Sequence, residues 1–342
     1  MASIKDVARL AGVSVSTVSR VLTNSPRVDE HTRARVEKAI ATIHYRPNLL
    51  AQGLRSKSGN VIGLVVPEIL HETFATFIKH TERACVERGF DLIIGNTGGR
   101  PEVEGAFIDN LLRRHVDGVI FSRVSDRSPV LNIVEKWGVP AVIIDRSLDR
   151  EDIPTVVLDN FQAGALAAEH LLGLGHRSLA LVTGPQDVGL ARERMKGFMS
   201  TLRQGRVALP ASHVVEGNFK FESGRDAALK LLQLQKLPSA IWCHNDLMAV
   251  GVMNVFARRG IRVPDDVSLM GMDDTGLAEM VVPALTSVTQ PFEEMCRTAV
   301  DLVLAMRGGQ RVRRRRVLLA PGITVRESTG PASPRAPARK VR

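Results

Sequence analysis

The chain has 342 residues, which is enough for two or three domains of ordinary size. Its formal charge of +10 is unevenly distributed, because residues 1–60 carry +6, residues 305–342 carry +10 and residues 61–304 carry −6. A basic terminal module indicates an anionic partner, either nucleic acid or a membrane surface. Apolar residues make up 44% of the chain and charged residues 24%, as in ordinary globular proteins, so most of it can bury a core.

Several classes of protein are excluded by local pattern. The three cysteines, Cys85, Cys243 and Cys296, lie far apart, so they form no disulfide framework and no CxxC metal or redox motif. The N-terminus lacks the apolar segment of a signal peptide, and no run approaches the roughly 18 apolar residues of a membrane span. We therefore expect a soluble protein of the reducing cytoplasm, with no membrane partner, no metal and no cofactor.

The first residues predict two short helices joined by a tight turn. Ser3 followed by Asp6 resembles a capping box, and Gly12 ends the helix that begins there. Ser14 is a suitable N-cap for a second helix over Val15–Leu22, whose apolar side chains recur on one face. Two helices that meet at a Gly-containing turn are typical of a helix-turn-helix.

A third helix is expected from Asp29, which can cap it, through His44, so that residues 1–45 form one small domain. The second helix of a helix-turn-helix fits the major groove of DNA, where its N-terminal residues reach base edges. Arg20 could form a bidentate contact with guanine, and the hydroxyls of Ser14 and Thr17 suit phosphates. The outward face offers Ser16, Thr17, Ser19 and Arg20. A small helical bundle without DNA binding is the alternative.

Residues 46–60 predict a linker with a short helix at Asn48–Arg55. That helix is too short to be stable alone in water, and Gly53 weakens it further, so it would fold only on a partner. The alternative is an inert linker with Leu54 packed on the core.

From residue 61 the pattern changes to short apolar strands that alternate with helices. The expected strands cover residues 61–66, 90–95, 116–121, 141–144, 179–182, 240–243 and 267–270. The expected helices cover residues 74–88, 102–114, 162–174, 192–203, 224–233 and 246–259. This alternation predicts parallel sheets covered on both faces by helices, arranged as two α/β lobes. The Pro-, Ala- and Arg-rich end, residues 329–342, is expected to be a disordered basic tail.

Polar and aromatic residues follow the expected strands, at the edge where doubly wound sheets bind ligands. Carboxylates and amides bond hydroxyl groups, arginine donates two bonds in one plane, and phenylalanine covers C–H surfaces, so the set suits a polyhydroxylated ligand. The candidate ligand-binding residues are His71, Phe74, Asp145, Arg146, Arg194, Phe219, Asn245, Asp273 and Gln290. Taken singly, the phenylalanines could belong to a core and the arginines to surface ion pairs.

The N-terminal motifs resemble the DNA-binding headpiece of the lactose-repressor (LacI/GalR) family, which includes the purine and ribose repressors. The matching residues are Ile4-Lys5-Asp6-Val7-Ala8, Ala11-Gly12-Val13-Ser14, Thr17-Val18-Ser19-Arg20-Val21-Leu22, Thr32-Arg33 and Tyr45-Arg46-Pro47-Asn48. The similarity continues to about residue 328. It implies a hinge and a periplasmic-binding-protein-like core that binds a small effector and dimerises. The lobes of that core would be residues 61–160 with 291–320, and residues 161–290 with 321–328.

The resemblance also implies roles for single residues. Paired hinge helices would enter the minor groove, where Leu54 wedges between base pairs and Arg55 lies in the groove or on phosphate. Val15 lies at a base-reading position of the headpiece, and Asn48 belongs to the same DNA-contacting set. Six of the candidate ligand-binding residues match effector-contacting positions: Phe74, Arg194, Phe219, Asn245, Asp273 and Gln290. Asp145 and Arg146 resemble the Asp-Arg pair of ribose-type sugar-binding proteins.

Two departures from the family leave the effector open. This chain has His71-Glu72-Thr73-Phe74 where many relatives have Asn-Pro-Phe-Phe-like residues, and Met272 replaces the usual tyrosine. We expect a DNA-binding transcriptional repressor that acts as a homodimer on a pseudo-palindromic operator in double-stranded DNA. A monosaccharide bound between the lobes would control its operator affinity, and a nucleobase or a sugar acid is the alternative effector.

Two other classes of protein compete with this interpretation. An enzyme is disfavoured because the chain lacks GxSxG, P-loop, GxGxxG and HExxH motifs, so no catalytic residue is predicted. His44, His176 and His244 are isolated and are expected to be structural or exposed. A transport receptor shares the core fold, but the helix-turn-helix speaks against it. The cluster Arg311–Arg316 is expected to be a solvated loop, with nucleic-acid binding as the alternative.

Overall fold

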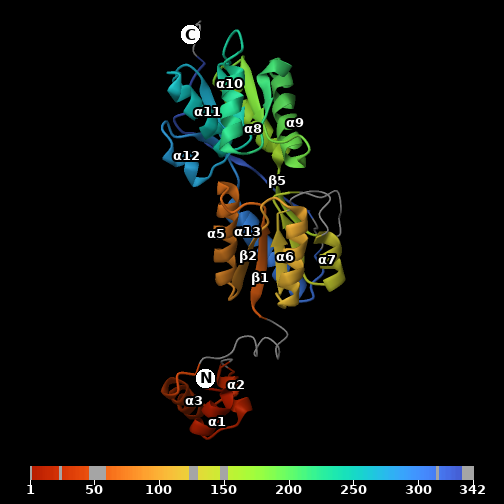
Figure 1. Ribbon diagram of the computed structural model, residues 1–342, viewed down its shortest axis with the longest axis vertical. Coiled ribbons are helices and arrows are strands. Elements are labelled where there is room, and N and C mark those ends of the chain that lie inside the picture. The colour runs from red at the N-terminus through yellow and green to blue at the C-terminus, as the bar shows by residue number, and fades with distance from the viewer. Residues whose placement is uncertain are drawn as a thin grey trace. The chain divides into compact units, whose positions relative to one another are not determined.

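The computed structural model describes residues 2–22, 25–45, 59–122, 130–146, 153–312 and 316–332. The hinge residues Asn48, Leu54 and Arg55 lie outside these ranges, as do residues 313–315 of the basic cluster. The chain forms two compact units that divide between Gly59 and Asn60. The first unit, hereafter the headpiece, is all-helical and drawn in red in Figure 1.

The headpiece contains the three predicted helices: α1 Ile4–Ala11, α2 Val15–Leu22 and α3 Glu30–Thr42. The capping box at the start of α1 is present, since Ser3 and Asp6 exchange side-chain and backbone hydrogen bonds. Asp29 caps α3 by accepting a hydrogen bond from the Thr32 N–H. The helix ends two residues before His44, because His44 adopts a left-handed φ of 47° that cannot continue it.

The three headpiece helices share one small core. Val7, Val18 and Val36, one from each helix, have no exposed surface. The turn between α1 and α2 depends on Gly12, whose φ of +63° favours glycine and whose carbonyl accepts a hydrogen bond from the Arg35 guanidinium. The core therefore fixes α2 against α1 and α3 in a helix-turn-helix.

The second unit begins with a six-stranded parallel sheet, which defines lobe one. Its strands are β1 Val61–Val66, β2 Asp91–Asn96, β3 Gly118–Phe121, β4 Ala141–Ile144, β5 Thr155–Leu158 and β11 Arg316–Leu319. They lie in the order β11-β5-β4-β3-β1-β2. The helices are α5 Glu72–Val86, α6 Pro101–Arg113, α7 Val130–Trp137 and α13 Phe292–Arg307. Figure 1 shows α5 and α13 on one face of the sheet and α6 and α7 on the other, where they pack in separate apolar clusters.

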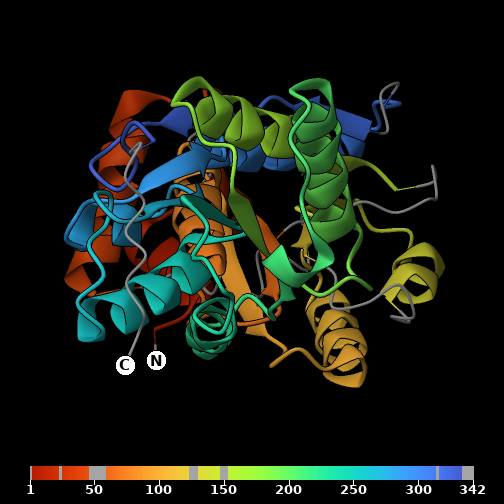
Figure 2. The same cartoon turned by 90° about the horizontal axis from the view of Figure 1, so that it is seen from above.

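A second six-stranded sheet defines lobe two. Its strands are β6 Leu179–Thr183, β7 Val214–Glu216, β8 Ala240–Cys243, β9 Ser268–Asp273, β10 Thr286–Thr289 and β12 Gly322–Thr324. They lie in the order β12-β10-β9-β8-β6-β7, and only β12 is antiparallel to its neighbour within this described sheet. The helices are α8 Asn160–Gly173, α9 Gly189–Gln204, α10 Phe221–Leu231, α11 Asp246–Arg258 and α12 Gly276–Met280. In Figure 2 the yellow-green α8 and green α9 lie on the opposite side of the sheet from α10 and α11.

The chain passes between the lobes at three places. Lobe one leads into lobe two after β5, lobe two leads back into lobe one after β10, and β11 is followed by β12 of lobe two. The predicted fold, a helix-turn-helix headpiece followed by two doubly wound α/β lobes, is confirmed. The carboxyl ends of parallel strands from both sheets carry the loops where ligands bind in such folds.

The disorder predicted for residues 329–342 is wrong for its first four residues. The Gly330 carbonyl lies 3.0 Å from His176 Nε2, and the Ala332 N–H donates to the Leu174 carbonyl over 2.8 Å. Gly330 and Ala332 are held by their backbone groups, and amino-acid composition does not reveal a backbone hydrogen bond. The remaining residues of the predicted tail, 333–342, lie outside the described ranges.

Candidate functional site

The exposed face of α2 carries the candidate DNA-contacting side chains. Ser14 caps the helix by accepting a hydrogen bond from the Thr17 N–H over 3.1 Å, and its hydroxyl lies 2.7 Å from that of Ser16. Val18 is fully buried on the opposite face, so that Ser16 and Arg20 remain exposed. The start of α2 therefore presents hydroxyls and backbone N–H groups, and Arg20 presents a planar donor, which is chemistry that contacts phosphates and base edges.

The other candidate residues of α2 are less accessible. Thr17 and Ser19 are partly buried, and the Thr17 hydroxyl lies 2.8 Å from that of Ser14. Val15 is also partly buried, because it packs against the headpiece core. Only part of the Val15 side chain is therefore available to a base.

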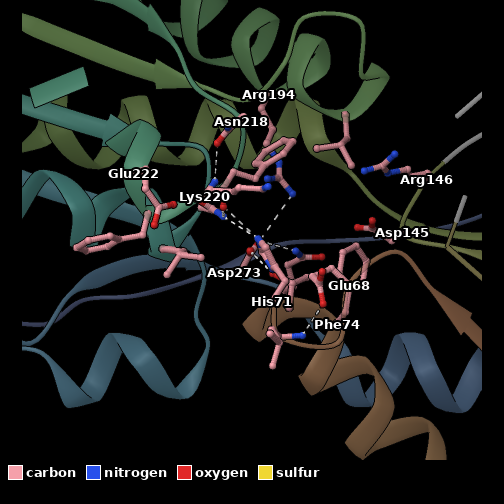
Figure 3. Close-up of a pocket in the computed structure, with 18 residues that line it drawn as sticks. Glu68, His71, Phe74, Asp145, Arg146, Arg194, Asn218, Lys220, Glu222 and Asp273 are labelled. Atoms are coloured by element: carbon pink, nitrogen blue, oxygen red, sulfur yellow. Dashed lines mark hydrogen bonds and ion pairs between the residues drawn. The ribbon is translucent and has the colours of Figure 1, made fainter. Parts of the chain in front are cut away.

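One cavity of about 490 Å³ lies between the two lobes, and all nine candidate ligand-binding residues line it (Figure 3). Lobe one contributes the start of α5 and the loop after β4, with Asp145 and Arg146. Lobe two contributes α9, the end of β9 and the segments after β7, β8 and β10. The structure thus brings together residues that are up to 219 positions apart in the sequence, from His71 to Gln290.

The cavity also has nine lining residues that were not predicted: Glu68, Leu70, Thr73, Leu190, Asn218, Lys220, Phe221, Glu222 and Leu247. Four of them, Asn218 and residues 220–222, follow β7. This strand has three residues and no long apolar run, so the sequence pattern does not predict it. Leu70, on the loop into α5, and Thr73, in its first turn, are neighbours of the predicted His71 and Phe74, so the position of those two residues was a sufficient signal for them.

Asp273 and Arg194 form the polar centre of the cavity. Asp273 ends β9, and its carboxylate accepts hydrogen bonds from the Thr73 hydroxyl and the Gln290 amide, each over 2.6 Å. Arg194 on α9 is 3% exposed and lies 3.8 Å from this carboxylate. Its guanidinium also donates to the Asn160 amide oxygen over 2.8 Å, and burial lowers its pKa from the usual value. The charges of Asp273 and Arg194 therefore largely compensate each other.

Three lining residues adopt left-handed backbone conformations: Asp145 with φ 73°, Phe219 with φ 65° and Asp273 with φ 106°. Such conformations cost about 1–3 kcal/mol each and persist where the surroundings hold them, most often at functional sites. Asp145 follows β4 and is buried, and burial raises the pKa of its carboxyl. The hydrogen bond that Asp145 accepts from the Ser122 hydroxyl is long at 3.4 Å, so a ligand hydroxyl could donate a better one.

His71 and Asn245 connect the lobes at the edge of the cavity. His71 Nε2 lies 3.2 Å from the Phe219 carbonyl oxygen, to which it donates in one tautomer, and 3.2 Å from Asn245 Nδ2. Asn245 also donates to the Phe219 carbonyl over 2.8 Å, and its amide oxygen caps α11 by accepting from the Met248 N–H. Both ends of the Asn245 amide thus have partners in the protein, which makes it a positioning group for Phe219 and His71.

The buried polar atoms of lining residues without a hydrogen-bond partner in the described part of the chain include two that can accept a hydrogen bond, Gln290 Oε1 and His71 Nδ1. Gln290 Oε1 is an acceptor, and His71 Nδ1 is an acceptor whenever the proton is on Nε2. A buried acceptor without a partner costs free energy, which a ligand that donates hydrogen bonds recovers.

A buried carboxyl behind the cavity predicts how stability depends on pH. Asp246 accepts hydrogen bonds from the Ser287 hydroxyl over 2.6 Å and the Thr275 N–H over 2.9 Å, yet burial and the nearby Asp273 raise its pKa to about 8. Between about pH 4 and pH 8 the folded chain therefore holds a proton that the unfolded chain releases. The contribution of Asp246 to the free energy of unfolding consequently falls as pH rises through this range. Asp246→Asn is expected to flatten that loss and to raise the Tm at pH 8 by at least about 2 °C.

Calorimetry from pH 5 to pH 8 measures this effect. Asp301→Asn is the matched control, because it removes an exposed carboxylate of α13 and should leave the pH dependence of the wild-type Tm unchanged. A variant at Asp246 whose Tm falls with pH as steeply as that of the wild type would show that this carboxyl is not protonated in the folded state.

The cysteines and the isolated histidines have structural surroundings. Cys85, Cys243 and Cys296 are all buried with free thiols, and burial raises their pKa values, that of Cys85 to about 12, so they remain protonated. His176 and His244 are buried, and burial lowers the pKa of each. His44, by contrast, is exposed beyond the end of α3.

No cluster of three or more His, Cys, Asp or Glu side chains suited to a metal ion occurs among the residues whose structure is described. Over the same ranges, no helix has the length and apolar character needed to cross a membrane.

Comparisons with known proteins match both units. A family described as bacterial regulatory proteins, lacI family, matches residues 3–48, and a periplasmic binding protein-like domain matches residues 168–329. The chain is 35% identical to the HTH-type transcriptional regulator DegA of Bacillus subtilis over 96% of its own length and 98% of that protein. It is 32% identical to the ribose operon repressor of Escherichia coli over 96% of its own length and 100% of that protein.

Solved structures agree with these matches. The lac repressor dimer bound to operator and the anti-inducer ONPF matches with a TM-score of 0.85 and 29% identity, over 96% of this chain and 99% of that chain. The transcriptional regulator CelR in complex with cellobiose matches with a TM-score of 0.72 and 31% identity, over 96% of this chain and 100% of that chain. With similarity to bacterial transcriptional regulators along almost its whole length, the chain belongs to the lacI family of bacterial regulatory proteins.

Proposed function

We propose that this regulator is a repressor that binds a pseudo-palindromic operator through α2 and that a neutral monosaccharide in the interlobe cavity controls its operator affinity. The observation that carries the proposal is the pairing, in one chain, of an exposed polar helix-turn-helix with a separate cavity lined by buried hydrogen-bonding groups. A change in operator affinity on effector binding is a coupling free energy between the two sites.

The chemistry of the cavity supports a neutral sugar. Asp145 and Gln290 offer acceptor atoms that hydroxyl groups can satisfy, and Phe74 and Phe219 can cover the C–H surface of a sugar ring. A sugar acid would need an excess of positive charge, but the cavity is lined by three cationic and four acidic residues, and the charge of Arg194 is already opposed by Asp273. Among the relatives, the ribose operon repressor and the CelR–cellobiose complex are named for neutral carbohydrates, whereas the repressor PurR of Klebsiella pneumoniae, 34% identical over 89% of this chain, is named for purines.

An apolar surface on lobe two supports a homodimer. Met280 and Val282, at the end of α12 and in the loop after it, are 80% and 90% exposed, although side chains of this kind are usually buried. A second copy of the chain would cover them, and a two-fold dimer matches the symmetry of a pseudo-palindromic operator. We place this dimer on chromosomal DNA in the cytoplasm, and we expect it to release the bound sugar unchanged.

The hinge completes the proposed DNA-contacting set. Asn48, Leu54 and Arg55 lie outside the described residues, and their contact with the minor groove stays a prediction. Ser14, Val15, Ser16, Thr17, Ser19 and Arg20 are proposed to contact the major groove and its phosphates.

Selection of binding sites from a random DNA library tests the DNA-binding part of the proposal. The full chain is expected to select a pseudo-palindrome, and Arg20→Ala should lose about 1–3 kcal/mol of discrimination at one base pair of each half-site. Lys38→Ala is the matched control, because it removes one exposed positive charge from α3 and leaves α2 intact. Equal loss of affinity for all operator variants would make Arg20 a phosphate contact instead of a base contact.

A further inference from the structure

The first residues of α5 cross the interlobe cavity and bond to lobe two. The Thr73 hydroxyl donates to Asp273 Oδ2 over 2.6 Å, between residues 200 positions apart, and both side chains are buried. Two residues earlier, His71 Nε2 lies 3.2 Å from the Phe219 carbonyl oxygen. We call His71 and Thr73 together the α5 latch.

The latch lies inside the proposed effector site. In Figure 3 the His71 side chain lies between Asp145 and Arg146 on one side and Lys220 and Glu222 on the other. A ligand that fills the centre of the cavity therefore meets the latch.

The latch also occupies the main acceptor of the cavity. One oxygen of the Asp273 carboxylate accepts from Gln290 and the other accepts from Thr73, so both oxygens have donors within the protein. Asp273 is 4% exposed and lines the cavity, so a donor that leaves Oδ2 can be replaced only from within the cavity.

We propose that the α5 latch holds the two lobes together without ligand and that it competes with the effector for Asp273. A hydroxyl of the effector takes the place of the Thr73 hydroxyl on Asp273 Oδ2, and the bond between the lobes then runs through the ligand. This inference rests on the proposed function in one respect, namely that the cavity binds the effector. It adds that the protein carries its own substitute for one effector hydroxyl.

Two consequences follow from the competition. Only the fraction of the protein in which the latch is open can bind the effector. The apparent Kd of the effector is therefore its intrinsic Kd divided by that fraction. Because the Thr73 hydroxyl is a hydrogen-bond donor, only a ligand that donates can replace it, and a carboxylate or phosphate group at this position would leave Asp273 beside a second acceptor. The latch therefore selects for ligands with hydroxyl groups.

A distance measurement between the lobes tests the latch without any ligand. All three native cysteines are buried, so spin labels can be directed to Glu102→Cys on α6 and Lys230→Cys on α10, two exposed positions in different lobes. The labelled chains are diluted with unlabelled full-length protein. Pulsed electron paramagnetic resonance then reports the distance between the two spin labels of one chain. Thr73→Val, which keeps the shape and removes the hydroxyl, is expected to add a population at longer distance, and His71→Ala/Thr73→Val is expected to enlarge it.

Two controls separate the latch from general damage to α5. Thr73→Ser keeps the hydroxyl and should keep the wild-type distance. Thr76→Val removes a hydroxyl whose hydrogen-bond partner among the described residues is the Glu72 carbonyl of the same helix, over 2.8 Å, and it should also keep the wild-type distance. An unchanged distance in the His71→Ala/Thr73→Val variant would overturn the latch. That result would leave the proposed function standing, because the measurement involves neither DNA nor sugar.

A titration of D-ribose, D-glucose and cellobiose, each into the wild type and into Thr73→Val, tests the competition. A sugar that binds the wild type is expected to bind Thr73→Val about tenfold more tightly, since a hydrogen bond to a charged group no longer has to be broken. Weaker binding to Thr73→Val would show that the Thr73 hydroxyl contacts the sugar itself, and the competition would be wrong.

Discussion

At effector concentrations near the wild-type Kd, Asp273→Asn is expected to abolish the response of operator binding to the effector. Asparagine has nearly the same shape and tolerates the left-handed φ of 106° at this position, so the backbone should be unchanged. The substitution removes the negative charge that opposes Arg194 and one of the two oxygens that accept hydrogen bonds. Each hydrogen bond to a charged group is worth about 1.5–3 kcal/mol, so sugar binding should weaken by about 10- to 100-fold.

Calorimetric titration of the sugar that most raises the Tm of the wild type measures this loss. Asp274→Asn is the matched control, because it is the same change at the next residue, which also has a positive φ but bonds Arg326 and does not line the cavity. It should lower the stability of lobe two and leave the sugar affinity of the folded protein unchanged. An Asp273→Asn variant with wild-type affinity would remove Asp273 from the site.

Gly164→Ala is expected to have the largest effect on stability, because α8 and α9 touch at glycines. A Cβ on Gly164 would lie 2.0 Å from the Arg194 carbonyl oxygen and 2.7 Å from the Phe198 nitrogen, both backbone atoms that cannot rotate away. The helices must separate, which costs about 1–3 kcal/mol or more, and each kcal/mol lowers the Tm by about 2–4 °C in a unit of this size. Since α9 carries Arg194, the same shift should also weaken sugar binding.

Thermal unfolding of Gly164→Ala against Gly173→Ala measures this effect. Gly173 ends the same helix α8, has a negative φ and has open space where a Cβ would be, so alanine should be neutral there or stabilising by up to about 1 kcal/mol. Equal Tm values for the two variants would contradict the close packing of α8 on α9.

The strands that the sequence predicts are those whose local pattern is unambiguous. β1, β4 and β8 are short continuous apolar runs that are buried on both faces, and the predicted bounds of all three are those of the structure. β10 is the segment Thr286–Thr289, which is mostly polar, so it carries no such run, although it is nearly as buried. α13 was overlooked although its buried residues, from Phe292 to Val303, recur at helical spacing, so its pattern was sufficient to predict it.

The candidate site was predictable to the extent that strand ends determine it. Asp145 comes directly after a buried strand and Asp273 ends another, and parallel strands bring their carboxyl ends to one edge. The contact between Thr73 and Asp273 joins two lobes across 200 positions, and no local pattern reveals such a pair. Asn245 shows a different limit of prediction from sequence. It caps α11 and donates to the Phe219 carbonyl. Its position before a helix is the same for an N-cap residue and for a ligand contact, so the sequence alone cannot distinguish the two roles.

The most direct test is the affinity of the full chain for its selected operator, measured by fluorescence anisotropy with and without a saturating concentration of the stabilising sugar. The operator Kd is expected to change by about tenfold, within the 5- to 150-fold range of typical allosteric coupling, and the sugar Kd should change by the same factor when operator is present. An operator Kd that is identical with and without bound sugar would contradict control of DNA binding through the interlobe cavity.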